Sequence, residues 1–125
     1  MTYSIGQFAN ITNISAHTLR YYEKEKLLIV NRGSAGRRFY TSEDVDWILF
    51  IKKLKDTGMS IKDIREYALL RYQGDSTMQL RLAILEKHKL AVVEEKTKWE
   101  SNLLNLDLKI RLYTSKLNKE PTTSS

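Results

Sequence analysis

The chain has 125 residues, 42% of them hydrophobic and 29% charged, and this length favours one small globular unit with at most one appendage. It contains no cysteine, which excludes disulfides, thiolate metal sites and thiol-based redox sensing. No run of about 18 apolar residues occurs and "MTYSIGQFAN" lacks the pattern of a signal peptide, so we expect a cytoplasmic protein without a membrane-spanning helix.

The net charge of +6 is concentrated near the start of the chain. Residues 1–41 hold six Lys or Arg against two Glu, a local charge of +4. A polyanion is one partner that fits this surplus, although a solvated surface with a chance asymmetry would explain the charge alone equally well. His17 and His88 lie far apart and have no acidic neighbours one helical turn away, so we expect no metal site and no cofactor.

Two short helices are expected first. Ser4 and Gln7 form a capping-box pattern, and the first helix should end near Thr12-Asn13. Ser15 can then cap a second helix. Two short helices joined by a tight polar turn predict a helix-turn-helix.

The second predicted helix separates its side chains by face. Leu19 and Tyr22 are spaced to pack on the first helix. The opposite, outward face carries Ala16, His17, Arg20, Tyr21 and Lys24. These groups suit contacts to phosphates and base edges, but an ordinary solvated amphipathic helix would look much the same.

A hairpin is predicted next. The β-prone runs "LLIV" and "RRFY" flank "NRGSAG", in which Gly33 and Gly36 supply the freedom that a turn needs. The tip and the returning strand carry Arg32, Arg37, Arg38 and Tyr40. Exposed arginines on hairpins often serve solubility, yet a second basic element beside the first favours nucleic acid as the partner.

Two further helices should follow the hairpin. Ser42 is the expected cap of the third helix, which should end at Thr57-Gly58, and Ser60 should open a fourth helix that ends at Gly74. Lys62 lies in the first turn of this fourth helix beside free backbone N–H groups. It is a candidate to hold one phosphate, unless it is simply solvated.

The last predicted helix, roughly 76–117, is too long for a compact domain and has a heptad pattern in which ten of twelve a and d positions are apolar. We therefore expect a coiled-coil dimer. Its predicted dimerisation residues are Leu82, Leu85, Val92, Trp99, Leu103, Leu106, Ile110, Tyr113 and Leu117. Lys89 and Lys96 occupy a positions and either weaken the seam or set its register. The expected divisions are a DNA-binding domain at 1–75, a dimerisation helix at 76–118 and a disordered tail at 119–125.

Four motifs occur in a fixed order before the long helix: "YSIGQFA", "ISAHTLRYYEKEKLL", "GRRFY" and "LKDTGMSIKDI". This series resembles the mercuric-resistance-regulator (MerR) family of bacterial transcription regulators, and the resemblance spans residues 2 to about 118. It implies a mainly α-helical fold, namely a winged helix-turn-helix dimer joined by an antiparallel coiled coil. It further implies that the second helix enters the major groove of a pseudo-palindromic promoter element. The residues implied at the DNA are His17, Thr18, Arg20 and Tyr21 in the groove, Arg38 and Tyr40 on the wing, and Lys62 as a backbone anchor. Arg37 replaces a common aromatic, so its contact should be electrostatic.

The resemblance also implies a mechanism. Typical members bind an over-long promoter spacer, and an effector makes the bound dimer bend and untwist the DNA for RNA polymerase. This chain lacks the cysteines of the metal and thiol sensors, with Lys53 at one of those positions. Either an unknown effector binds noncovalently near the third and fourth helices and the partner's coil, or no effector exists. Trp47, Tyr67 and Trp99 could line such a site or serve only in packing.

Two rival functions remain. One is an architectural or phage-type DNA-binding protein that bends DNA without sequence choice. The other is an enzyme, which we do not expect because the chain has no Cys nucleophile and no glycine-rich phosphate loop, and its carboxylates at helix starts are explained by capping.

Overall fold

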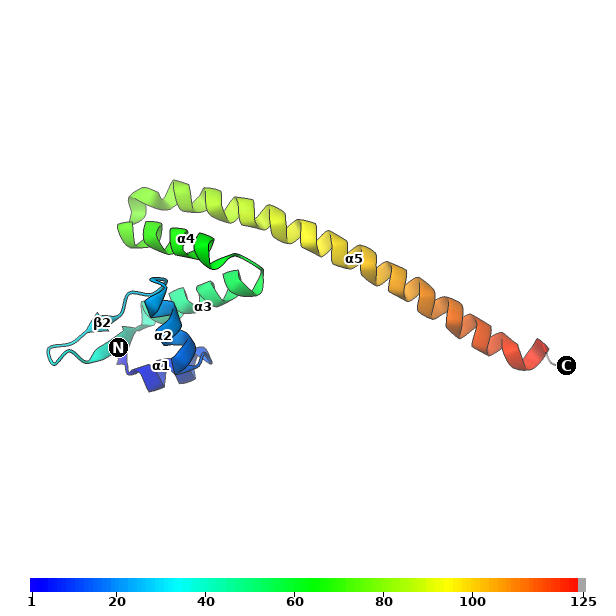
Figure 1. Cartoon of the computed structure of the whole chain (residues 1–125), viewed down its shortest axis with the longest axis horizontal. Helices are drawn as coiled ribbons and strands as arrows, with labels where there is room; N and C mark the ends of the chain where they lie inside the picture. The colour runs from blue at the N-terminus through cyan, green and yellow to red at the C-terminus, as the bar shows by residue number, and fades with distance from the viewer. Residues whose placement is uncertain (124–125) are drawn as a thin grey trace. The chain divides into compact units, whose positions relative to one another are not determined.

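The computed structural model describes the backbone of residues 1–123 and the side chains of residues 1–119. In chain order its elements are β1 (Thr2–Tyr3), α1 (Ile5–Thr12), α2 (Ala16–Lys24), β2 (Asn31–Arg32), β3 (Arg38–Thr41), α3 (Ser42–Asp56), α4 (Ile61–Gln73), the 3-10 turn η1 (Asp75–Thr77) and α5 (Met78–Thr123) (Figure 1). The chain divides into two compact units, Met1–Glu86 and Lys87–Ser125. The mainly helical fold predicted from the sequence is confirmed.

The helix-turn-helix forms where the capping residues predict it. The Ser4 hydroxyl accepts a hydrogen bond from the Gln7 backbone N–H, and the Gln7 side chain accepts one from the Ser4 backbone N–H. Asn13 then ends α1 in the left-handed conformation at φ 55°, which Asn tolerates better than most residues. The Ser15 hydroxyl caps α2 by accepting from the backbone N–H of Thr18. Side-chain oxygens thus satisfy the free N–H groups at both helix starts.

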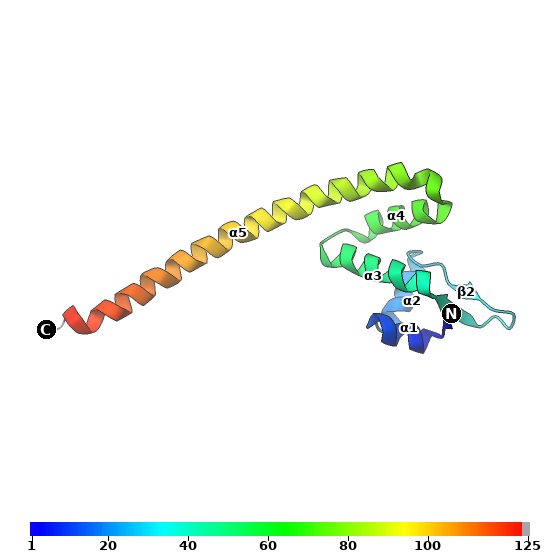
Figure 2. The same ribbon diagram turned by 180° about the vertical axis from the view of Figure 1, so that it is seen from behind.

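The wing is a three-stranded antiparallel sheet in the order β1-β3-β2. Figures 1 and 2 both show the β2–β3 hairpin projecting beyond α1 and α2. The strand predicted over "LLIV" is wrong: Leu27 and Leu28 are fully buried in a bend, and β2 begins only at Asn31. The bend is held by hydrogen bonds that the indole of Trp47 donates to the Leu27 carbonyl and that the Ile29 N–H donates to the Tyr72 hydroxyl. Burial in the core outweighs the β propensity of this run.

One apolar core lies under these elements. Phe8 from α1, Leu19 from α2, Ile48 and Ile51 from α3, and Ile64 from α4 have at most 1% of their surface exposed. Burying a side chain of this kind contributes roughly 1.5–3 kcal/mol. The core therefore fixes α2 and the base of the wing on one rigid support.

The N-cap residue of helix α3 lies one position earlier in the chain than predicted. Thr41, not Ser42, is the N-cap, because Asp44 three residues later completes a capping box with it, whereas Ser42 has Val45 at that distance. The predicted ends at Thr57 and Gly74 and the predicted cap at Ser60 are confirmed.

Helix α5 starts at Met78, after the turn η1, and continues to Thr123, so it includes part of the stretch expected to be a disordered tail. Residues 124 and 125 lie outside the described residues. The first turns of α5 belong to the N-terminal unit, since Ile84 and Leu85 pack on its core. The compact N-terminal unit thus extends past the expected boundary at residue 75, to Glu86.

Candidate nucleic-acid interface

The outward face of α2 is arranged as its helical spacing predicts. His17, Arg20, Tyr21 and Lys24 are exposed, whereas Leu19 and Tyr22 are buried against the core. The adjacent tyrosines therefore point in different directions. Burial of the Tyr22 phenol raises its pKa above 10.0, and the neighbouring Asp56 and Tyr21 act in the same direction. Tyr22 stays a neutral core residue while Tyr21 is available to a ligand.

Thr18 has a more local role than its neighbours on α2. It is half-buried, its N–H binds the Ser15 hydroxyl, and its own hydroxyl accepts a hydrogen bond from Ser15 at 2.9 Å. Of the residues expected at the groove, it is the one most engaged inside the protein. Its position at the start of α2 still brings it beside the free N–H groups of the first turn.

Two neighbouring arginines of the wing differ in their exposure to solvent. Arg37 is exposed near the hairpin tip, and Arg38 is half-buried on β3. Arg32 closes the tip from the other strand by donating from Nη1 to the carbonyl of Gly36, 3.0 Å away. Gly36 has φ 73°, a conformation that L side chains rarely adopt, so the tight tip requires glycine there.

Tyr40 does not lie where a wing contact was expected. Only 1% of its surface is exposed, and its ring stacks on Phe8 with centroids 4.4 Å apart and planes 11° apart. Burial and the carboxylate of Glu23 raise the pKa of Tyr40 above 10.0, and the nearby guanidinium of Arg38 opposes this shift. Because Phe8 of α1 covers this part of β3, Tyr40 has almost no surface exposed on the wing. Tyr40 is therefore a core residue, and its hydroxyl lies near the charged side chains of Glu23 and Arg38.

Glu23 was not singled out in the sequence, yet it joins α2 to the wing. Its carboxylate lies 2.9 Å from Nη1 of Arg38 and 4.0 Å from Nη2 of Arg32. Glu23 lies one helical turn after Arg20 on α2, and its ion pairs show that this residue faces the wing. An acidic residue close to several exposed cations of α2 could have drawn attention to Glu23. Its partners could not be predicted, because they are more than eight residues away along the chain.

Glu25 makes a second connection that the sequence did not reveal. Its carboxylate pairs with Arg65 of α4, and Nε of Arg65 also donates to the Glu25 backbone carbonyl at 3.1 Å. Lys62 is exposed in the first turn of the same helix α4, where it was expected. The end of α2 is therefore fixed to the helix that carries this lysine.

The aromatic residues considered for an effector site are divided between the two units. Trp47 and Tyr67 are 4% and 8% exposed and stack on one another, and the Arg71 guanidinium covers Trp47 at 4.3 Å. These two residues pack the core. A polar cavity of about 600 Å³ lies nearby, bordered by β2, the start of α3, the end of α4 and the start of α5. Trp99, by contrast, is 70% exposed on α5. Among the described residues, no group of three or more His, Asp or Glu side chains could hold a metal ion.

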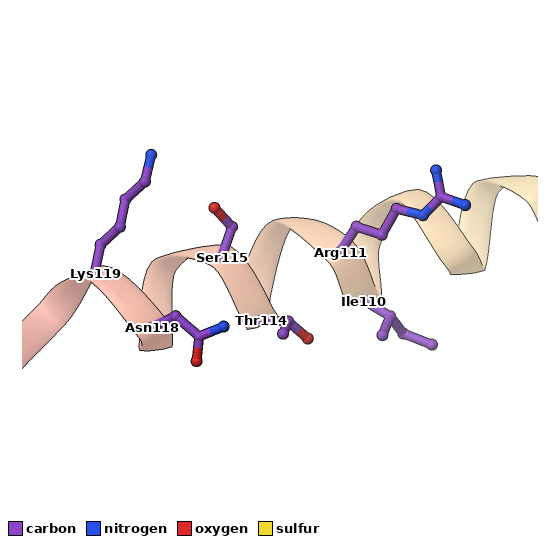
Figure 3. A pocket seen from close by; sticks show the side chains of 6 residues that line it. All are labelled: Ile110, Arg111, Thr114, Ser115, Asn118 and Lys119. Carbon is purple, nitrogen blue, oxygen red and sulfur yellow. The ribbon is translucent and has the colours of Figure 1, made fainter.

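The second unit is a single helix that exposes many large apolar side chains among its charged ones. Of the predicted dimerisation residues, Val92 is half-buried and those from Trp99 onward are exposed: Trp99, Leu103, Leu106, Ile110, Tyr113 and Leu117. Figure 3 shows the side chains around a hollow of about 440 Å³ near its end, and they point to opposite sides of the one helix that carries them. This hollow is an open surface rather than an enclosed site. Leu82 is exposed at the start of α5, whereas Leu85 is partly used by the core.

Two capped helices joined by a tight turn and followed by a basic hairpin define a winged helix-turn-helix protein. The chain belongs to the MerR family of helix-turn-helix regulatory proteins. The model of the MerR HTH regulatory family matches residues 3–70, and a second model, "MerR, DNA binding", matches residues 45–98.

Relatives and solved structures agree with this assignment. An uncharacterized HTH-type transcriptional regulator of Haemophilus influenzae is 38% identical over 114 residues, which are 90% of this chain and 84% of the relative. The uncharacterized regulator YyaN of Bacillus subtilis is 38% identical over 96% of both chains. The fold matches the crystal structure of HiNmlR, a MerR family regulator lacking the sensor domain, bound to promoter DNA, with a TM-score of 0.82, 37% identity and 92% of each chain covered. No helix in the described part of the chain is long and apolar enough to cross a membrane.

Proposed function

We propose that this chain is a homodimeric transcriptional regulator that binds a pseudo-palindromic promoter element. The observation that carries the proposal is that α2, with its exposed His17, Arg20, Tyr21 and Lys24, is joined to the wing arginines Arg32 and Arg38 by the ion pairs of Glu23. A helix and a neighbouring hairpin held in this way suit one groove of DNA and the phosphates beside it. The promoter DNA bound by HiNmlR, which shares this fold, supports the same reading.

The roles that we assign follow exposure and chemistry. His17, Arg20 and Tyr21 would reach base edges in the major groove, with Thr18 and Lys24 beside them. Arg37 and Arg38 would bind the flanking phosphates, and Lys62 would hold one more phosphate from α4. Tyr40 supports this surface from the core instead of forming part of it.

The exposed apolar side chains of α5 support a dimer. Leu103, Leu106 and Ile110 have 59%, 58% and 52% of their surface exposed, and they follow the heptad spacing of a coiled-coil seam. A helix that exposes this many large apolar groups to water is strongly driven to find a partner. We propose that two copies of α5 pair in antiparallel orientation, which would place two basic surfaces for the two halves of a palindrome.

Regulation would act through the shape of the DNA. Bending a promoter spacer costs a few kcal/mol, so a protein state that favours the bent form changes how RNA polymerase meets the two promoter elements. An effector bound without covalent chemistry would select that state. The second candidate is an architectural protein with no effector. The chain has no cysteine, so the thiol chemistry by which many regulators of this family sense their effectors is not available to it.

The test is a comparison of affinities for an inverted repeat taken from the DNA upstream of the gene and for a scrambled duplex, at several salt concentrations. A sequence-specific regulator should prefer the repeat by about 10³-fold or more, whereas a ratio near unity favours the architectural protein. Replacing Arg20 by Ala should weaken operator binding by about 1–3 kcal/mol. Arg111→Ala, on α5, is the matched control and should leave affinity unchanged. Equal effects of the two substitutions would contradict the proposed interface.

A further inference from the structure

Glu23 is an acidic side chain within the basic surface, and its geometry explains why it is there. Its carboxylate lies 2.9 Å from Arg38 and 4.0 Å from Arg32, so it reaches from α2 to both strands of the β2–β3 hairpin. Its side chain is 25% exposed, while those of Arg38 and Arg32 are 34% and 53% exposed. The Glu23 side chain is therefore the least exposed of the three, and both arginines keep surface that is open to solvent.

The register of the wing creates a need for this acid. Arg32 and Arg38 are directly opposite one another on β2 and β3. Two like charges at such a position destabilise a strand pair, because their side chains lie within a few ångströms of one another. A carboxylate that reaches both removes this repulsion. The buried Tyr40, two residues after Arg38 on β3, underlies this pair from the core side.

We propose that Glu23 is a positioning residue for DNA binding, which fixes the guanidinium of Arg38 and thereby the angle of the wing against α2. This inference rests on the proposed function, since it assumes that Arg38 meets a DNA phosphate. A guanidinium has five N–H donors in a planar fork, so it can bind a carboxylate on one edge and a phosphate on another. An arginine already held in place loses less side-chain freedom when DNA binds.

The proposal predicts an effect opposite in sign to that of simple charge. Removing a negative charge from a surface that faces a polyanion should strengthen binding if only the net charge matters. If Glu23 positions Arg38, Glu23→Gln should instead weaken binding, because the glutamine keeps the size of the side chain but loses the charge-assisted pair.

The experiment measures operator affinity of the full-length protein by fluorescence anisotropy, first confirming that the wild type prefers the operator to a scrambled duplex. Glu23→Gln should weaken operator binding by about tenfold, as expected for the loss of one charge-assisted interaction. Asp46→Asn is the control: it likewise removes one negative charge from an exposed position of the N-terminal unit, on α3, and none of the ion pairs among the described residues involves it. This control should bind as tightly as the wild type or more tightly.

A double-mutant cycle separates positioning from a general structural effect. In an Arg38→Ala background, Glu23→Gln should cause no further loss, since Glu23 acts through Arg38. Each single substitution should also lower the slope of log affinity against log salt by about one phosphate contact. Glu23→Asp, which keeps the charge, should restore part of the affinity and serves as the informative variant if Glu23→Gln folds poorly.

Two outcomes would overturn the inference: operator binding by Glu23→Gln that equals or exceeds that of the wild type, or an unchanged loss when Arg38 is already Ala. A wild-type protein that shows no preference for the operator would instead overturn the proposed function on which the inference rests.

Discussion

Tyr22 and Tyr40 carry the same phenol as the exposed Tyr21 but lie inside the protein. Tyr22 is 5% exposed and Tyr40 is 1% exposed, and burial raises the pKa of both phenols above 10.0. Nearby carboxylates add to the shift, from Asp56 at Tyr22 and from Glu23 at Tyr40. The folded protein therefore binds these two phenolic protons more tightly than the unfolded chain does.

This difference predicts that stability falls at alkaline pH. Below pH 10.0 both states hold the protons and the phenols contribute no pH dependence; above it the unfolded chain releases them first, so the free energy of unfolding decreases with rising pH. Urea denaturation followed between pH 8 and pH 11 should show a midpoint that drops above about pH 10. Tyr22→Phe and Tyr40→Phe should each flatten the drop. A midpoint that rises over this range would contradict the argument.

At this scale, the sequence predicts side chains whose orientation depends on one helix alone. Leu19 and Tyr22 inside and Tyr21 outside follow from helical spacing, which needs no knowledge of the rest of the fold. Tyr40 and Glu23 depend on what α1 and the wing bring to them. From the sequence alone, Arg38 and Tyr40 both look like surface contacts of a hairpin. Only the fold shows that Phe8 covers Tyr40.

Among the elements, the turn after α2 is held in an unusual conformation. Lys26 has φ 64°, and its N–H bonds back to the Glu23 carbonyl while the Leu27 N–H bonds to that of Tyr22. This is the way many helices end, but the position is usually occupied by glycine because a Cβ there costs roughly 1–2 kcal/mol. The turn is thus strained at the point where α2 leads toward the wing.

Replacing Lys26 by Gly should stabilise the protein by about 0.5–1 kcal/mol, since the relief of strain exceeds the extra freedom that glycine gains in the unfolded chain. Lys24→Gly, inside the last turn of α2, is the control and should destabilise by about 1 kcal/mol. Both changes remove one positive charge, so a general charge effect would move them in the same direction. Thermal unfolding of the two variants distinguishes these cases.

Elements with local start and stop signals could be predicted, and those fixed by distant contacts could not. Ser4, Ser15 and Ser60 cap their helices because the hydrogen bonds lie within three residues. The two-residue strand Thr2–Tyr3 is too short to show a period, and it forms only because β3 passes beside it. The run at Leu27 and Leu28 has strand propensity, but it forms a buried bend because the Trp47 indole binds the Leu27 carbonyl in the core.

For the whole molecule, the boundary between the two units lies within α5 and not before it. Ile84 and Leu85 pack on the core, and Arg81 donates to the Thr77 hydroxyl and to the Gly74 carbonyl. The heptad pattern assigns Leu85 to the seam because it cannot distinguish an apolar residue used by the partner from one used by its own unit. The N-terminal unit consequently needs the first turns of the long helix.

A chain that ends at Glu86 should keep the fold of the N-terminal unit but behave as a monomer in light scattering. Its operator affinity should fall by about 10²-fold or more, because two linked sites bind far more tightly than one. A chain that ends at Asp75 is the comparison and should melt at a lower temperature, since it loses the contacts of Arg81, Ile84 and Leu85. A dimer that survives removal of residues 87–125 would show that the pairing of α5 is wrong.

The two tryptophans of the chain lie one in each unit, and this gives each unit its own optical reporter. Trp47 is 4% exposed in the core of the N-terminal unit, while Trp99 is 70% exposed on α5. Emission from Trp47 should follow unfolding of the core. Emission from Trp99 in a Trp47→Phe variant should shift to longer wavelength on dilution, as the indole that the proposed seam covers returns to water. Dissociation and unfolding of the same protein can therefore be measured separately, without any added label.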